Sequence, residues 1–534
     1  MNKKAYLIII LSFFVLVFLS GCIFDDIFNF GTTFSVNSWE IVDDEGFPAI
    51  HINFETNGRI DLKTYNSNSQ QIDHEYFYGD GNATLDIGRY RQIVSSEEIT
   101  LKAFDVNDNL ISTKTFNFNG PNLSLISFTP FIWEDENKNS LIGIELNLKN
   151  NGDTPVYPYF SKIKYNKVSF ENYILPSVVM PGSSKKASFF LYIKNIQDGD
   201  LFHITLEDID GNTILNQSLS FSNMKNLDTT SFSKGLESSL TLPIVDFLYD
   251  YYDEHEIYTQ DYAAFVFDRY DDQFIDFLVD EIKSTLNFSE YNYSSMNDVE
   301  KINYFAGFVQ HLKYREDLIN AKEIEDPQYP VDTIFNYMGM GGGDCEDKAI
   351  LIASILSNLE YNVTLLKIPN HMAVGVNLSK EALPSKDYYI NGYYFLDTSY
   401  SDLGFVHQDY KNPDEIELFP IIKRPCIHHT WRDDTSTIYL HSNGTKTLKV
   451  VVYIDNLGEL KTDDLEIRGV FYVNKTGTVI KEKSYFLQNI EPYNKDKAII
   501  SMVIPKNLKC KFDTRIYLDG ELVSTQTSLK EFNS

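Results

Sequence analysis

The sequence predicts a multidomain chain in which all-β sandwich domains flank a central α+β domain. Its 534 residues are more than one hydrophobic core usually organises, and suggest three or four domains. From about residue 33 to 225, short runs alternate apolar and polar residues between turns, which is typical of strands with one buried face. From about 226 to 425 the apolar period becomes helical. The expected domains are residues 23–120, 121–225, 226–425 and 426–534, preceded by a leader of residues 1–22.

Three segments share the order strand, Asp/Asn/Gly turn, strand, which predicts a β-hairpin. They are "AFDVNDNLISTKTFNF" (103–118), "LEDIDGNTILNQSLSF" (206–221) and "IYLDGELVSTQTSL" (516–529). Their recurrence predicts three sandwich modules that end near residues 120, 225 and 530. The second and third modules also contain "LKNNGDTPV" and "YIDNLGELK" near their starts. These motifs resemble the Asn-Gly turn of adhesion-type immunoglobulin-like domains on prokaryotic surface proteins, which implies a spacer or a binding scaffold.

Helical spacing of apolar residues distinguishes the central domain from its neighbours. One group comprises Ile275, Leu278, Val279 and Ile282, and a second group runs over residues 302–312. The acidic and aromatic segment 246–258 is interpreted as a solvated helix or a connector, with the lining of a cleft as the alternative.

The chain is strongly acidic. Its 76 Asp and Glu residues against 46 Lys and Arg residues give a formal net charge of -30. This charge repels nucleic-acid phosphates, and the sequence has no basic stripe, so we expect no nucleic-acid partner. The acidity favours solubility but identifies no other partner.

The N-terminus has the composition of an export signal. "MNKK" is basic, "AYLIIILSFFVLVFL" is an apolar run of fifteen residues, and "LSGC" ends at Cys22. The run is short for a membrane span and has the charged flank of a signal peptide. The segment from Leu19 to Cys22 resembles the lipobox of prokaryotic lipoproteins, which implies that Cys22 is the lipidated first residue of the mature chain. We expect an extracytoplasmic protein anchored to an archaeal or bacterial membrane, with an uncleaved anchor helix as the alternative.

Three further cysteines fall in the expected exterior part: Cys345, Cys426 and Cys510. An odd number leaves at least one thiol unpaired, and a disulfide between Cys426 and Cys510 is the pairing we consider, against both remaining reduced. Glycosylation sequons occur at Asn82, Asn122, Asn287, Asn292 and Asn443, but an Asn- and Ser-rich chain also produces them by chance.

"GGGDCEDKAILIASIL" (341–356) has the signature of a helix start. Asp344 is expected as the N-cap, and Asp347 three residues later completes a capping-box-like pair. Cys345 then lies in the first turn, where the helix dipole favours a thiolate and lowers the thiol pKa. The preceding glycines permit a tight approach and leave room for a substrate backbone beside the sulfur. A small buried cysteine is the alternative.

A thiol nucleophile needs a base and a group that orients the base. His371 begins the alternating strand "HMAVGV", and a second strand, "GYYFLDTSY", carries Asp397. If the two strands are antiparallel neighbours, His371 and Asp397 lie side by side, and the carboxylate fixes the tautomer of the imidazole. Separately, the two residues have ordinary interpretations as a satisfied histidine and a turn acid.

The combination resembles the transglutaminase-like superfamily, whose members share a papain-like core with Cys, His and Asp in this order. The matching segments are "YPVDTIFNYMGMGGGDCEDKAILIASIL", "NHMAVGV" and "YYFLDTS", within residues 297–402. The resemblance implies that Cys345 is the nucleophile, His371 the general base and then acid, and Asp397 the residue that orients it. It also implies attack on an amide carbonyl and a thioester acyl-enzyme. No cofactor is expected.

The oxyanion of such a reaction needs hydrogen-bond donors. Backbone amides at Cys345 and the preceding loop are candidates, and "FAGFVQHLKY" offers Gln310 as a side-chain donor. Animal transglutaminases have a tryptophan roughly at that place, and no "GQCW" motif occurs here. The resemblance therefore does not extend to glutamine–lysine cross-linking or calcium dependence. A polar residue on a solvated helix face is the alternative for Gln310.

Metal sites are not expected. His428, His429, His441 and Asp433 cluster around "HHTWRDD", but their spacing matches no standard ligand set. The Asp-rich turns, including "EDENKNSL" (134–141), are expected to be ordinary turns, since this segment lacks the glycine and distal glutamate of a calcium loop.

Three functions remain open. The first is a surface-anchored thiol hydrolase that cuts a peptide or isopeptide bond in a protein or cell-wall peptide. The second is an acyl transferase that passes the acyl group to an amine. The third is a structural or adhesive lipoprotein whose central domain binds without turnover. The partners of the sandwich domains are not indicated by the sequence.

Overall fold

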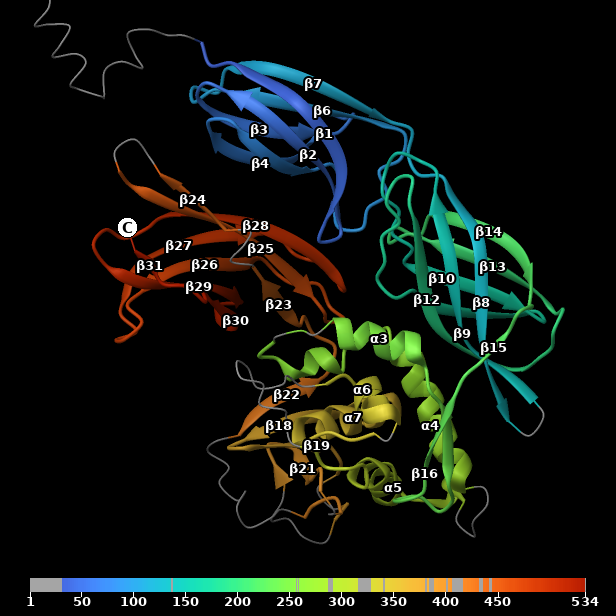
Figure 1. The fold of residues 1–534 in the computed structure, drawn as a ribbon. Helices are drawn as coiled ribbons and strands as arrows, with labels where there is room; N and C mark the ends of the chain where they lie inside the picture. Colours follow the sequence, from blue (N-terminus) through green and yellow to red (C-terminus); the bar gives the residue numbers. More distant parts are fainter. Residues whose placement is uncertain are drawn as a thin grey trace, which may run out of the picture. The chain divides into compact units, whose positions relative to one another are not determined.

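The computed structural model describes residues 31–534 except 136–137, 256, 258, 287–291, 316–327, 340, 380–381, 384–388, 400–401, 406–415, 432–435, 441–443 and 534 (Figure 1). The expected leader with Cys22 lies outside the described residues, as do Asn287, Asn443, Asp433 and His441. Where the chain is described, it is mostly β-strand in small, mainly antiparallel sheets, which agrees with the expected sandwich domains. None of the described helices has the length and apolar character needed to span a membrane.

Two compact units make up the chain. The first comprises the residues up to Arg89 together with Val94–Gly120, and the second comprises Tyr90–Ile93 together with Pro121–Ser534. The first unit has a sheet of order β1-β2-β5 and a sheet of order β4-β3-β6-β7. The strands are β1 (Phe34–Asp44), β2 (Phe47–Thr56), β3 (Arg59–Tyr65), β4 (Gln71–Tyr78), β5 (Gly81–Asp86), β6 (Glu97–Phe104) and β7 (Leu110–Phe118). Alternate apolar side chains of both sheets form one core, as expected for a sandwich.

The second unit begins with another pair of sheets, of order β11-β10-β13-β14 and β12-β9-β8-β15. The strands are β8 (Leu123–Asp135), β9 (Lys138–Asn150), β10 (Phe160–Tyr165), β11 (Val168–Tyr173), β12 (Ser184–Ile196), β13 (Leu201–Glu207), β14 (Thr213–Ser220) and β15 (Lys225–Asn226). Side chains such as Leu146, Phe189 and Ile204 fill the space between these sheets.

The unit ends with a third pair of sheets. In one of them β23 (Ile427–Thr430), β24 (Thr437–Leu440) and β28 (Asn494–Val503) pair with β25 (Lys446–Asn456). The other has the order β27-β26-β29-β30, with β31 on β29. Its strands are β26 (Leu465–Tyr472), β27 (Val479–Leu487), β29 (Lys509–Leu518), β30 (Glu521–Thr527) and β31 (Phe532–Asn533).

All three hairpins predicted from the sequence are present, as β6–β7, β13–β14 and β29–β30. The first two have the same turn. Asp105 Oδ1 accepts hydrogen bonds from the amides of Asn107 and Asn109 at 2.8 and 2.9 Å. Asp208 Oδ1 likewise accepts from the amides of Asp210 and Asn212 at 3.0 and 2.7 Å. These carboxylates close their own turns, which explains the Asp and Asn residues without a bound ion.

A buried asparagine has the same role in the second and third sandwiches. Asn150 Oδ1 accepts from the amides of Gly152 and Asn122, and its Nδ2 donates to the carbonyls of Thr154 and Val179. Asn456 repeats this pattern, since Oδ1 accepts from the amides of Gly458 and Cys426 and Nδ2 donates to the carbonyls of Leu460 and Ile490. Each asparagine thus joins the start of its domain to a turn and to a loop segment distant in the sequence, which explains the similar motifs around them.

The central domain opens with the hairpin β16 (Thr229–Phe232) and β17 (Leu240–Pro243). Its helices are α3 (Asp246–Glu254), η1 (Tyr262–Phe265), α4 (Asp272–Leu286), η2 (Tyr293–Ser295), α5 (Asp298–Gln310), α6 (Pro330–Gly339) and α7 (Cys345–Asn358). A sheet of order β20-β21-β19-β18-β22 follows, with β18 (Val363–Ile368), β19 (His371–Val376), β20 (Tyr389–Ile390), β21 (Tyr393–Leu396) and β22 (Glu417–Ile421). The residues expected on the helical faces of α4 and α5 are buried. Apolar residues of α7 pack with apolar residues from one face of this sheet in the largest hydrophobic core of the described residues.

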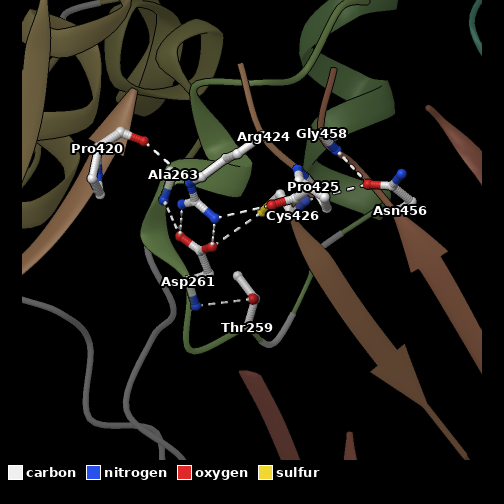
Figure 2. Close-up of polar contacts among 9 residues, drawn as sticks. All are labelled: Thr259, Asp261, Ala263, Pro420, Arg424, Pro425, Cys426, Asn456 and Gly458. Carbon is white, nitrogen blue, oxygen red and sulfur yellow. Dashed lines mark hydrogen bonds and ion pairs between the residues drawn. The ribbon is translucent and has the colours of Figure 1, made fainter. Parts of the chain in front are cut away.

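An ion pair holds the segment that leaves this sheet toward the third sandwich. Arg424 donates from both terminal nitrogens to Asp261, at 2.6 and 2.8 Å (Figure 2). Asp261 also accepts from the amide of Ala263 and so caps η1. The sulfur of Cys426 lies 3.4 Å from Asp261 Oδ2, the oxygen that also accepts from Arg424 (Figure 2).

The disulfide considered between Cys426 and Cys510 is not formed. Both cysteines are free and buried. Cys426 packs with the core of the central domain, whereas Cys510 packs within the third sandwich. The two thiols belong to separate hydrophobic cores, so at least one core would have to open before they could form a disulfide.

Candidate functional site

Helix α7 begins as expected, with Cys345 as its first residue. The Asp344 side chain accepts from the amide of Glu346 at 3.1 Å, and Asp347 Oδ2 accepts from the amide of Asp344 at 3.1 Å, within a complete capping box. Asp347 Oδ1 also accepts from the amide of Gln328, which ties the helix start to the chain before α6. Cys345 is therefore held at the N-terminus of a well-capped helix.

The glycines before Cys345 are required by close backbone packing. Gly342 has a φ of +144, and a Cβ there would lie 2.5 Å from the carbonyl oxygen of Lys313. A Cβ on Gly343 would lie 2.4 Å from Asp347 Oδ2, the carboxylate of the capping box. The amide of Gly343 donates to Lys313, and its carbonyl accepts from Arg315. The glycine loop thus packs against the chain after α5.

The sulfur of Cys345 is hydrogen-bonded to a carboxylate. Sγ donates to Glu346 Oε2 at 3.0 Å, and the backbone of Met372 forms a hydrogen bond that favours the thiolate. Burial of the sulfur, followed by the negative charge of Glu346, raises the pKa of the Cys345 thiol well above its ordinary value. The expectation of a lowered thiol pKa is therefore wrong for this arrangement, because burial and the adjacent carboxylate raise the pKa by more than the Met372 hydrogen bond lowers it.

His371 and Asp397 lie together, as the strand arrangement predicts. β19 and β21 are antiparallel neighbours, with Val374 opposite Leu396. His371 Nε2 lies 3.4 Å from Asp397 Oδ1, and the two side chains are only 11% and 4% exposed. Burial alone would raise the pKa of Asp397, but hydrogen bonds from His371 and from the backbone and hydroxyl of Ser399 lower it below its ordinary value. Asp397 is thus held as a carboxylate that faces the imidazole.

The structure places the sulfur of Cys345 next to the start of β19, the strand that begins with His371. The sulfur contacts the backbone of Met372, the residue next to His371 in β19. The thiol itself donates its hydrogen bond to Glu346, however, and not to the imidazole of His371. The sequence motif predicts the two residues, and only the coordinates identify Glu346 as the competing partner.

The side chain of Gln310, which the sequence suggested as a donor to a substrate oxyanion, is hydrogen-bonded to the backbone of Asp397. Its side chain is buried at the end of α5, and Nε2 donates to the backbone carbonyl of Asp397 at 2.9 Å. This bond joins the Gln310 amide to the backbone of the third member of the predicted triad.

His429 has a structural role at the start of the third sandwich. His429 lies buried in β23, with Nδ1 at 2.6 Å from Ser524 Oγ and Nε2 at 2.8 Å from Thr514 Oγ1. Burial, followed by the proximity of His428, lowers the pKa of His429 to about 3. A neutral histidine with both nitrogens bonded fits the interpretation as an ordinary polar residue.

Among the described residues, Asp344, Cys345 and Glu346 place potential ligand atoms within 4.8 Å of one another. Asp344 is engaged in the helix cap and Glu346 in the thiol hydrogen bond. These bonds account for the grouping, so we assign no metal to it.

The comparisons with known proteins identify no family. No family model matches the chain, and no curated protein matches it. Solved structures give weak similarities, among them a putative β-galactosidase from Bacteroides fragilis, at 10% identity and a TM-score of 0.15 over 31% of this chain and 28% of that one. The receptor tyrosine kinase Torso matches at 12% identity and a TM-score of 0.15, over 36% of this chain and 73% of that one. The YadV chaperone matches at 8% identity and a TM-score of 0.13, over 36% of this chain and 99% of that one. The chain spans little more than a quarter of the β-galactosidase.

Proposed function

We propose that this protein is a thiol-dependent amide hydrolase, a peptidase or isopeptidase, in which Cys345, His371 and Asp397 form the catalytic triad. The observation that carries this proposal is that His371 Nε2 lies 3.4 Å from Asp397 Oδ1, next to Met372, whose backbone forms a hydrogen bond with the Cys345 sulfur. The proposed central domain is a papain-like core of the transglutaminase-like superfamily, on the sequence resemblance within residues 297–402. The proposed location is the outer face of a prokaryotic membrane, through a lipid on Cys22.

The chemistry assigned to the site is acyl transfer through sulfur. His371 takes the proton of the Cys345 thiol while the sulfur attacks the amide carbonyl carbon, and the C–N bond then breaks as the imidazolium returns the proton to the leaving amine. Water next attacks the thioester and gives a proton to His371. The C–S bond breaks, the acid is released and the sulfur recovers its proton. Because Nε2 faces Asp397, Nδ1 is the nitrogen assigned to these proton transfers.

The raised pKa of the Cys345 thiol favours proton transfer during attack over a preformed thiolate–imidazolium pair. In this form of the mechanism His371 acts as a general base, and the carboxylate of Asp397 stabilises the imidazolium as it forms. The backbone amides of the Gly343–Cys345 segment are the candidate donors to the oxyanion.

An acyl transferase to an amine is the second candidate, and the charges around the sulfur favour it. Asp344 and Glu346 place two carboxylates beside Cys345, which would attract an ammonium group more strongly than a neutral nucleophile. Measurement of the amide product with and without an added primary amine separates the two reactions, since a hydrolase gives the free acid in both cases.

The proposal is tested by the rate at which iodoacetamide labels Cys345, followed by peptide mass spectrometry from pH 4 to 9. The expected result is labelling that slows when His371 is replaced by Ala. Equal rates in the two proteins would rule out the triad and leave a binding lipoprotein without turnover as the better description. The buried free cysteine Cys426 is an internal control that should remain unlabelled in both proteins.

A further inference from the structure

The end of helix α5 makes contacts with the site that the triad itself does not explain. Gln310 is the last residue of α5, and its Nε2 donates to the backbone carbonyl of Asp397 at 2.9 Å. The carboxylate of the same Asp397 faces His371. A hydrogen bond at the backbone of Asp397 restricts where its side chain begins, and therefore restricts the position of the carboxylate.

A buried lysine of α7 fixes this end of α5. Lys348 lies one turn after Cys345 and is 3% exposed. Its Nζ donates to the carbonyls of Leu312 at 2.7 Å and Gln310 at 3.3 Å. Carbonyls at a helix C-terminus lack partners within the helix and carry partial negative charge, so an ammonium group stabilises them. Burial lowers the pKa of Lys348 to about 8, which leaves most of the side chain charged at pH 7.

The same segment also touches the loop of the nucleophile. The chain after α5 exchanges two backbone hydrogen bonds with Gly343, through Lys313 and Arg315. The end of α5 therefore connects the loop before Cys345 to the backbone of Asp397.

We propose that Gln310 and Lys348 are positioning residues of the proposed site: Lys348 holds the C-terminal end of α5, and Gln310 holds the backbone of Asp397, so that the imidazole of His371 is correctly oriented. This inference rests on the proposed function. It assigns Gln310 a role that differs from donation to a substrate oxyanion.

Alkylation separates these two roles. Iodoacetamide forms a C–S bond and releases iodide at a saturated carbon, so the reaction has no tetrahedral oxyanion. Loss of an oxyanion donor leaves its rate unchanged, whereas misplacement of Asp397 and His371 slows it.

The experiment compares the labelling rate of Cys345 in the full-length protein and in Gln310→Met and Lys348→Met. Both substitutions keep an unbranched apolar stem and remove the donor. We expect the labelling of Cys345 to be roughly tenfold slower in each of the two variants. A loss of about this size is typical when a residue that orients a metal-binding histidine is replaced. Gln526→Met is the matched control, because Gln526 Nε2 also donates to a backbone carbonyl, that of Trp431, at 2.9 Å in the third sandwich.

A double-mutant cycle distinguishes positioning from general destabilisation. In an Asp397→Asn background the Gln310→Met substitution should slow labelling by less than twofold, since the residue on which it acts is already altered. Equal effects in both backgrounds would contradict the inference. If one of the two donor variants does not fold, the other answers the same question, because both act through the end of α5.

The outcomes distinguish this inference from the proposed function. Labelling at the wild-type rate in Gln310→Met and Lys348→Met overturns the positioning role, and a loss of amide hydrolysis alone in Gln310→Met would support the oxyanion role instead. Failure of the proposed function would give a different result: Cys345 would be labelled at the wild-type rate in His371→Ala.

Discussion

His371 Nε2 lies 3.4 Å from Asp397 Oδ1, because His371 begins β19 and Asp397 directly follows β21, the antiparallel neighbour of β19. This relationship is the strongest support for a catalytic use of Cys345, because it fixes which nitrogen of the imidazole faces the carboxylate. The neighbouring thiol, in contrast, is bonded to Glu346. The predictions below concern this site and the scaffold that holds it.

Glu346 restrains the thiol of Cys345, the proposed nucleophile. Burial and then the Glu346 carboxylate raise the pKa of the Cys345 thiol, so Glu346→Gln should lower that pKa and shift the labelling profile to lower pH. We expect labelling at pH 7 to be roughly tenfold faster, since an adjacent unit charge in a partly buried site is worth on the order of one pKa unit or more. Glu360→Gln makes the same charge change beyond the other end of α7 and should leave the profile unchanged. A slower reaction in Glu346→Gln would show that the carboxylate assists the thiol.

The triad should contribute to stability in a pH-dependent way. Burial raises the pKa of Asp397, but its hydrogen bonds from His371 and Ser399 lower it by more, so the folded pKa is below the unfolded value of about 3.9. The stabilisation is therefore present above pH 4 and is lost as the pH falls through the folded pKa. Hydrogen exchange of β19 and β21, measured at pH 6 and at pH 3, should show a difference between wild type and Asp397→Asn that is smaller at pH 3. A constant difference would mean that the carboxylate charge is not involved.

Gly343 should not tolerate a side chain. A methyl group there would lie 2.4 Å from Asp347 Oδ2, so Gly343→Ala should displace the capping box, destabilise α7 by about 2 kcal/mol and slow the labelling of Cys345. Gly307→Ala in helix α5 provides the control, since a Cβ at Gly307 would have the carbonyl oxygen of Gly235, 3.8 Å away, as its only neighbour. That substitution should stabilise the helix by about 1 kcal/mol and leave labelling unchanged. Thermal melting and peptide mass spectrometry of the two variants measure both effects.

The two buried asparagines of the sandwiches should be equivalent and local in effect. Asn456→Ala removes the hydrogen bonds to the amides of Gly458 and Cys426 and to the carbonyls of Leu460 and Ile490, and should cost about 3 kcal/mol. Asn150→Ala should have a similar effect in the second sandwich. Hydrogen exchange followed by mass spectrometry should show faster exchange confined to the domain that carries the substitution. Exchange spread evenly over both sandwiches would contradict the assignment of one asparagine to each domain.

Local patterns predicted much of the scaffold. Turn residues at fixed offsets identified the three hairpins, because Asp side chains such as Asp105 and Asp208 close turns by bonding to amides only two and four residues away. The helix start at Cys345 was also predictable, since a capping box depends on residues within one turn. The resemblance of segments within 297–402 named Cys345, His371 and Asp397 before any coordinates.

The interactions that the sequence did not reveal depend on the folded chain, and several of them join residues that are far apart in the sequence. The pKa of Cys345 depends on burial, which no local motif reports, and its expected direction was therefore wrong. Gln310 and Asp397 are 87 residues apart, so their hydrogen bond exists only after α5 and β21 have packed. The Cys426 and Cys510 thiols, which spacing alone left free to pair, belong to separate cores. The sequence by itself thus determined the strands, turns and helix starts, through short-range hydrogen bonds and the period of its apolar residues. The tertiary structure decided the direction of the thiol pKa shift and the partners of Gln310 and the cysteines, because burial and long-range contacts are properties of the folded chain.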